Sequence, residues 1–571
     1  MASSHGGNDQ DASSNEKEYN GHLENDFHNS TTCVDDDDEH DGHRPRDLDL
    51  SRTRTTSWVS AVQPAQTPLG ATLSRRETAL SRIRSRPFVP QFSHPLGQMK
   101  TGDDVIVDFE GPDDPYRSVN WPTKKKVFTT LIYGLVTGSS TWASSSLSPG
   151  NKQIAEQYHV SQEVALLSTS LFLVGFGVGP LLWAPLSEVY GRRTAVLPPV
   201  FISLIFSFAT ASATNLQTIL ITRFFAAFFA SAPVTNTGGV LGDLFTPAYR
   251  GIAFAGYAMA VVGGPALGPI ISSTLIAQPR LGWRWAEYLT GFIQVFVLAL
   301  AVIFVDETYP PALLVAKARR LRVETGNWAL HAKFEEWDVS ISELTRKFLV
   351  RPIQLLCTPI CFLVALYASF CYGILYMQLA AVPTIFGEHR GFGIIDSELP
   401  FLAIFLGAVV GAGINVYNQF IYNKAYEAAG NRALPEKRLP PMMVGSLMFA
   451  GGQFITAWTA DPLHIHWIVP VIGLFFTGTG FFTIFQAALN YLVDTFTMYA
   501  ASAIAANTFL RSLFATVFPL LVTPVYGKLG IGPGASIFAG FSVLLIPVPY
   551  AFYIYGRRIR AASKWSKPSV I

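Results

Sequence analysis

The sequence predicts an all-α membrane protein with twelve transmembrane helices in two six-helix halves. Half of the residues are apolar and only 14% are charged, against about a quarter charged in soluble domains. The apolar residues gather in blocks of roughly 20, the length needed to cross a hydrocarbon core about 30 Å thick. A short motif also recurs six blocks apart, which indicates a duplicated unit.

The chain begins with a long polar segment. Residues 1–120 contain an acidic run from Asp35 to Asp41 and an Arg-, Ser- and Thr-rich stretch over 51–86. Such a segment cannot bury enough apolar surface to fold, which predicts a disordered tail. Two alternatives remain open for the stretch 51–86: a region of regulatory phosphorylation, or a solvated tail without a regulatory role.

Twelve apolar blocks follow the tail. The first six lie at 127–147, 164–184, 194–213, 217–242, 251–275 and 285–305. The other six lie at 355–380, 398–423, 440–460, 465–492, 500–526 and 534–556. We therefore expect an N-terminal bundle over 121–305, a polar central loop over 306–354, a C-terminal bundle over 355–556 and a tail over 557–571.

The distribution of Lys and Arg predicts the orientation. The segments on the side of the N-terminus hold Lys124–Lys126, Arg192, Arg193, Arg250 and many basic residues of 306–354. The segments on the opposite side hold little beyond Lys152, Arg280, Arg284 and Arg390. Because basic loops stay in the cytoplasm, both termini and the central loop are expected there.

Several function classes find no support in the sequence. The net charge is +2, which does not favour nucleic-acid binding. Cys357 and Cys361 are one helical turn apart, but no His or further Cys nearby completes a zinc site, so we expect neither a metal nor a cofactor. We find no nucleophile with a base and no ATP-binding loop. The chain is therefore not expected to be an enzyme, and an ion gradient must supply any energy it uses.

The repeated motif lies at equivalent places in the two halves. Leu241–Thr246 ends the fourth block and Leu492–Thr497 ends the tenth, and four of the six residues are the same, among them Asp243 and Asp494. Paired halves around a central site are the way in which many transporters build alternating access. The sequence therefore predicts a secondary transporter.

Ionisable side chains inside the apolar blocks are functional candidates, because each costs at least about 2.5 kcal/mol at mid-bilayer. Arg223 precedes Asp243 by 20 residues, which places it about 30 Å from the cytoplasmic side. It either reaches the outer interface or is a buried cation that meets a dipole of the substrate or changes the proton affinity of a neighbouring acid. Arg511 is near mid-depth, and Glu163 begins the second helix. We name all three as candidates for proton coupling; the alternatives are a structural role for Arg511 and a plain interface role for Glu163.

Aromatic and amide side chains occur together at helical spacing in the second half. Such a mixture suits an apolar or aromatic ligand with a few polar handles, although helix packing is the open alternative for each residue. The candidate substrate-binding residues are Tyr372, Tyr376, Gln378, Phe481, Phe485, Gln486, Asn490 and Asn507.

The turn between the second and third blocks carries a recognisable motif. The run from Ala184 to Arg193 resembles the signature of the major facilitator superfamily, with Ala184 in place of its first glycine and Glu188 in place of its usual aspartate. The resemblance implies the major facilitator fold and a charged turn whose ion pairs form in one access state and break in the other. The candidate gating residues are Glu188, Gly191, Arg192, Arg193, Asp243 and Asp494.

Two further motifs narrow the resemblance. Ile221–Ala227 is similar to the fourth-helix motif of proton-coupled members, which implies a coupling role for Arg223. The fifth block resembles the antiporter motif through Gly264, Pro265, Gly268 and Pro269. Together with stretches such as Asp306–Tyr309 and Pro435–Arg438, these matches resemble the fungal twelve-helix drug:proton antiporters over roughly residues 112–565.

The family resemblance implies a proton-coupled antiporter. Its expected cargo is a small, largely apolar or aromatic compound, such as a drug, a fungicide or a toxin of the cercosporin type. The expected partners are this compound, protons and the lipid bilayer; we expect a monomer in the plasma membrane. The alternatives are a nutrient facilitator or proton symporter, a polyamine exporter, and a membrane sensor that does not transport.

Overall fold

The computed structural model describes residues 105–336, 346–430, 432–461, 464–496, 499–563 and 566. Most of the predicted N-terminal tail, including the stretch 51–86, lies outside the described residues. The same holds for a part of the central loop, 337–345, and for most of the last residues after 563.

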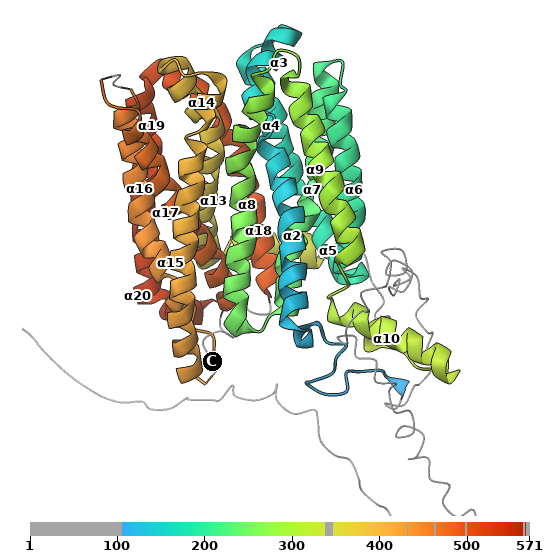
Figure 1. Ribbon diagram of the computed structural model, residues 1–571. Coiled ribbons are helices and arrows are strands. Elements are labelled where there is room, and N and C mark those ends of the chain that lie inside the picture. The colour runs from blue at the N-terminus through green and yellow to red at the C-terminus, as the bar shows by residue number, and fades with distance from the viewer. Residues whose placement is uncertain are drawn as a thin grey trace, which may run out of the picture. The chain divides into compact units, whose positions relative to one another are not determined.

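The first half consists of long helices at the six predicted positions (Figure 1). They are α2 (Thr123–Ser145), α4 with α5 (Gln162–Val178 and Pro180–Tyr190), α6 (Arg192–Ala211), α7 (Leu216–Leu244), α8 (Pro247–Ile276) and α9 (Gly282–Phe304). Helices α4 and α5 form one span that is interrupted at Gly179, because Pro180 has no N–H to donate. The short helices α3 (Asn151–Tyr158) and α10 (Pro310–Thr325) lie at opposite ends of this half.

The second half has the same number of long helices, and its spans also match the predicted blocks. They are α13 (Pro359–Val382), α15 (Phe401–Ala428), α16 (Pro440–Ala460), α17 (Ile468–Phe496), α18 (Ala500–Leu529) and α19 with α20 (Ile531–Leu545 and Pro547–Ala562). The short helices α12 (Arg351–Leu356) and α14 (Ile394–Glu398) precede α13 and α15.

Ten of these spans are long and apolar enough to cross a membrane. The remaining two long helices, α2 and α16, complete the predicted twelve. Helix α2 is less apolar because its buried face carries many hydroxyl side chains, and several of them donate to carbonyls of the preceding turn, as Ser140 does to Val136 at 3.1 Å. The predicted fold class, an all-α membrane protein with two six-helix halves, is confirmed.

We name the two ends of the helix bundle after their short helices, the α3 end and the α10 end (Figure 1). At the α10 end, residues 105–120, which the sequence placed in the tail, pack against α10 and the segment that follows it. The backbone N–H of Val107 donates to the His331 carbonyl at 2.8 Å, and Asp114 pairs with Lys317 at 3.0 Å. Val107 also joins Val315 in a small apolar cluster, which explains why this part of the polar segment is held in place.

The two halves pack most extensively along two helix pairs, α4 with α18 and α8 with α15. Close contact at the first pair depends on Gly177, because a Cβ there would lie 2.6 Å from Cβ of Ser512. This interface therefore brings residues of distant blocks within reach of one another.

Candidate functional site

A buried ion pair joins α7 and α9. Nη1 of Arg223 lies 3.2 Å from Oε1 of Glu287, and each side chain is only 1% exposed. The guanidinium also donates to backbone carbonyls, to Ala143 at 2.7 Å, to Ser144 at 3.4 Å and to Ser168 at 3.3 Å. Arg223 is thus a buried cation with a carboxylate partner, and it does not reach the outer interface.

Glu287 is the partner that sequence reasoning missed. It lies five residues after the first residue of α9, hence about 8 Å from the α3 end of that helix. The Ser146 hydroxyl donates to its carboxylate at 3.2 Å. The available signal was its position as the lone charged residue of the block 285–305, and such a residue inside a membrane segment is a functional candidate.

A second buried group gathers around Arg511 of α18. The guanidinium carbon of Arg511 lies 4.4 Å from the ring centroid of Tyr372 and 5.3 Å from that of Phe485. Tyr372 in turn packs against Tyr376 and Phe481, with ring centroids 5.0 and 6.1 Å apart. Four of the predicted binding residues and the predicted Arg511 therefore form one cluster, which we call the aromatic cluster.

Hydroxyl groups connect this cluster with the ion pair across the two halves. The Tyr372 hydroxyl donates to Tyr376 at 3.5 Å, and the Tyr376 hydroxyl shares a hydrogen bond of 2.9 Å with Ser144 Oγ. Ser144 belongs to α2, and its carbonyl accepts from Arg223. A continuous chain of contacts thus runs from Glu287 in the first half to Arg511 in the second.

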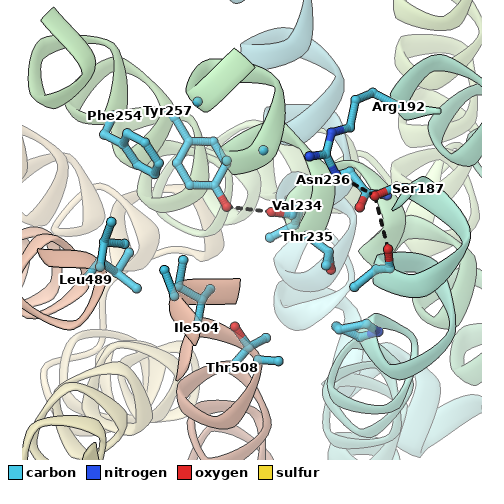
Figure 2. Close-up of a pocket in the computed structure, with 18 of the residues that line it drawn as sticks. Ser187, Arg192, Val234, Thr235, Asn236, Phe254, Tyr257, Leu489, Ile504 and Thr508 are labelled. Carbon is cyan, nitrogen blue, oxygen red and sulfur yellow. Dashed lines mark hydrogen bonds between the residues drawn. The ribbon is translucent and has the colours of Figure 1, made fainter. Parts of the chain in front are cut away.

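A cavity of about 230 Å³ extends from Arg511 towards Arg192 and Arg250, which lie at the α10 end. Its walls are mainly apolar, and Figure 2 shows Phe254 and Tyr257 of α8 on the side opposite Leu489 and Ile504. Near the α3 end the halves touch instead, through the Tyr376–Ser144 bond and through Ser148, which donates to the Leu379 carbonyl at 3.0 Å. The cavity therefore belongs to a state that is closed between the halves at the α3 end.

The other four predicted binding residues either lie outside the aromatic cluster or have buried polar atoms without a hydrogen-bond partner. Asn490 lines a separate cavity of about 360 Å³ beside Asp494. Gln486 donates to the Gly251 carbonyl at 3.3 Å, whereas its Oε1 has no hydrogen-bond partner. Gln378 Oε1 and both amide atoms of Asn507 are also buried without a partner.

At the α10 end of the first half, the predicted gating residues form a compact ion-pair network. Nε of Arg192 lies 3.0 Å from Oδ2 of Asp243. The Glu307 carboxylate accepts from the backbone N–H groups of Arg192 at 2.9 Å and Arg193 at 3.0 Å, and so caps the start of α6. Gly191 precedes them with a φ of +89°, and a Cβ there would lie 2.5 Å from Glu307. Glycine is thus required at this turn by both its backbone conformation and its close contact.

Tyr309 closes this network from the side of the central loop. The Arg192 guanidinium lies 4.8 Å from the centre of its ring. Burial raises the pKa of Tyr309 to about 12, so its hydroxyl stays protonated.

The second half repeats this pairing at the same end. Nε of Arg438 lies 2.9 Å from Oδ2 of Asp494, to which the Tyr422 hydroxyl also donates at 2.9 Å. Beside it, Arg560 pairs with Glu436 at 2.6 Å. Arg438 precedes α16 as Arg192 begins α6, so each half holds the aspartate of its repeated motif with an arginine from the start of the preceding long helix.

The antiporter motif packs α8 closely against α2. A Cβ at Gly264 would collide with Thr141 and the backbone of Trp142, and one at Gly268 would collide with Ser145. Ser145 also donates to the Gly264 carbonyl at 3.4 Å. Pro265 and Pro269 lie within α8, which continues through both.

Two further expectations concern groups outside these clusters. Glu163 is exposed in the first turn of α4, next to the N-capping Ser161, so the structure does not bring it into the buried ion pair. Among the residues that the structure describes, no group of three or more His, Cys, Asp or Glu is placed to hold a metal ion.

Two six-helix halves around a cavity, with a buried ion pair in the first half and a buried arginine at the cavity, define a multi-pass membrane transporter. The sequence matches the family model of the Major Facilitator Superfamily over residues 133–519. The chain therefore belongs to this superfamily, and the family predicted from the motifs is confirmed.

The curated relatives are fungal transporters. The efflux pump bik6 of Gibberella fujikuroi is 48% identical over 473 residues, which cover 83% of this chain and 97% of the relative. The multidrug transporter FLU1 of Candida albicans is 39% identical over 527 residues, which cover 92% of this chain and 86% of the relative. Among solved structures, the proton:xylose symporter XylE matches with a TM-score of 0.56 at 15% identity, over 76% of this chain and 97% of that one. This last likeness concerns the fold alone.

Proposed function

We propose that this chain is a proton-coupled antiporter that exports small, largely apolar or aromatic compounds from the cytoplasm. The observation that carries the proposal is the buried Arg223–Glu287 pair and its hydroxyl connection to the aromatic cluster. The names of the Gibberella efflux pump and the Candida multidrug transporter support the direction of transport.

The proposed orientation has the α10 end in the cytoplasm, together with both termini. The Lys and Arg bias supports it, since Arg192, Arg250 and Arg438 all belong to segments at that end. The cavity then extends towards the cytoplasm, which is the side from which an exporter takes its cargo. Both walls of the cavity come from one chain, which supports a monomer as the transporting unit, and the proposed location is the plasma membrane.

Glu287 is the proposed proton carrier and Arg223 its partner. When the carboxylate is ionised, it pairs with the guanidinium, as in the structure. A proton on Glu287 removes the charge that holds this pair and leaves Arg223 with the carbonyls of Ala143 and Ser144 on α2. Because Ser144 also bonds Tyr376 of the second half, this change acts directly on the contact that closes the α3 end.

The ion pairs at the α10 end have a complementary role in the proposal. Arg192–Asp243 and Arg438–Asp494 hold the turns of the two halves at the side where cargo enters. When the halves rock, these turns approach or separate, so the pairs set the relative stability of the two access states.

The test of coupling uses yeast that expresses the chain and fluorescent or radiolabelled aromatic compounds. We expect efflux to depend on the proton gradient, and hence to be lost with an uncoupler, in Arg223→Ala and in Glu287→Gln, at unchanged surface expression. Glu156→Gln, which removes an exposed acid of α3 at the same end, is the matched control and keeps efflux. Efflux that ignores the uncoupler would reject proton coupling and favour a facilitator.

Reconstituted protein separates coupling from transport as such. In proteoliposomes, Glu287→Gln is expected to keep exchange of labelled for unlabelled cargo but to lose uphill accumulation driven by a pH gradient. Tyr376→Phe, which removes only the hydroxyl of the contact between the halves, is expected to weaken accumulation more than exchange. Equal loss of exchange and accumulation in both variants would contradict the assigned roles.

A further inference from the structure

Arg511 differs from the other buried arginines of the helix bundle. Arg223, Arg438 and Arg560 each lie within 3.2 Å of a carboxylate oxygen. Arg511 is only 3% exposed, yet no carboxylate in the described part of the chain pairs with it, and its Nε has no hydrogen-bond partner. A buried charge without a counter-ion destabilises a fold, so a ligand that supplies the counter-ion would bind there with a gain in free energy.

The described neighbours of Arg511 do not use its N–H groups as hydrogen-bond donors, so these groups can donate to such a ligand. The rings of Tyr372 and Phe485 stack against the guanidinium, at 4.4 and 5.3 Å, and accept no hydrogen bond in its plane. One helical turn earlier on α18, the amide of Asn507 is buried with both polar atoms unpaired. Polar hydrogen-bonding capacity is therefore unused at this point of an otherwise apolar cluster.

Arg511 also lines the cavity that extends to the α10 end. The charged residues of that lining are Glu188, Arg192, Arg250 and Arg511, so basic groups outnumber acidic ones. Arg192 is paired with Asp243. The apolar walls, which include Phe254 and Tyr257, suit a flat hydrocarbon body (Figure 2). A cationic cargo such as a polyamine would face this excess of positive charge.

We propose that the cargo is an anionic aromatic compound, bearing a carboxylate or an acidic phenol that is ionised at neutral pH, and that Arg511 binds the anionic group. The guanidinium offers the planar, two-pronged donor that a carboxylate accepts, and the aromatic cluster holds the ring system. This inference names the substrate class of the proposed exporter and rests on that proposed function.

The test compares two probes of nearly equal shape, 2-naphthoate and 2-naphthamide, on the purified full chain in lipid nanodiscs. Because a hydrogen bond between charged groups contributes more than a neutral one, we expect the acid to bind about tenfold tighter than the amide. Arg511→Gln is expected to lower binding of the acid to the level of the amide and to leave the amide unchanged. Arg511→Lys is expected to keep part of the preference, and Arg280→Gln, a change of an exposed arginine, to keep all of it.

Equal binding of acid and amide by the wild-type chain would overturn the inference, as would a preference for the acid that survives in Arg511→Gln. Equal losses for both probes in Arg511→Gln would assign Arg511 a structural role instead. If Arg511→Gln does not fold, the inference is tested by comparing acid and amide binding in the wild-type chain and in Arg511→Lys. A failure of the proposed function would look different. If cells still export the acid in the presence of an uncoupler, proton coupling is rejected, whereas the preference of Arg511 for the acid over the amide is unaffected.

Discussion

Replacing Glu287 with methionine would leave the Arg223 guanidinium buried without its counter-ion. Loss of one partner of a buried pair typically costs about 3–5 kcal/mol, and three backbone carbonyls still accept from Arg223. We therefore expect a loss in the free energy of unfolding near the lower end, about 3 kcal/mol. Arg223→Met is expected to lower the free energy of unfolding by less. The carboxyl of Glu287 that it leaves alone can become neutral by taking up a proton, whereas a guanidinium cannot lose one.

The double variant decides whether the two residues act as a pair. When methionine replaces both residues, no buried charge is left without a partner. The double variant is therefore expected to lose less free energy of unfolding than Glu287→Met alone. The assay is reversible unfolding of the purified chain in mixed micelles with increasing SDS, followed by tryptophan fluorescence. If the two single losses add to the double loss within about 0.5 kcal/mol, the pair is not coupled and the reasoning is refuted.

Two further predictions concern the α10 end. Gly191→Ala is expected to destabilise by about 1–3 kcal/mol, since φ is +89° and the new Cβ meets Glu307, and a thermal melt checks this. In the control Gly256→Ala, a Cβ meets nothing within 4 Å and alanine is favoured inside α8, so it should not melt below the wild type. The pKa of Asp114 is lowered because, against the effect of burial, backbone N–H groups and Lys317 stabilise its carboxylate. The contact between Asp114 and α10 is therefore stable above the unfolded pKa of about 3.9 and is lost as pH falls through the lowered pKa. Hydrogen exchange of residues 105–120, corrected for the pH dependence of intrinsic amide exchange, measures it, and protection that is unchanged on acidification would contradict the prediction.

The helical spans were predictable because hydropathy is a local property. Each block of apolar residues must form a helix in lipid, where every backbone N–H and C=O needs an internal partner. The ends were less predictable: α15 continues to Ala428 and α20 to Ala562, beyond their apolar blocks, because a helix can continue in water where hydropathy no longer marks it.

The candidate site was predictable one residue at a time but not as an arrangement. Arg223, Arg511 and Tyr372 were singled out by charge or by aromatic spacing, whereas the partners of Arg223 lie on α2, α4 and α9. Glu287 was missed because a single acid near the edge of an apolar block has no local pattern that shows its burial. Burial and pairing depend on which helices pack together.

The sequence alone determined that this chain crosses the membrane in two related halves, which family it resembles, and that Arg223 and Arg511 carry charge into the bilayer. These are properties of composition, period and motif. Only the tertiary structure decided that Arg223 has a counter-ion and Arg511 has none in the described part of the chain. The reason is that ion pairing requires distances of a few ångströms between side chains. In this chain α7 and α9 both pack against α2, which brings Arg223 and Glu287, 64 residues apart along the chain, within 3.2 Å.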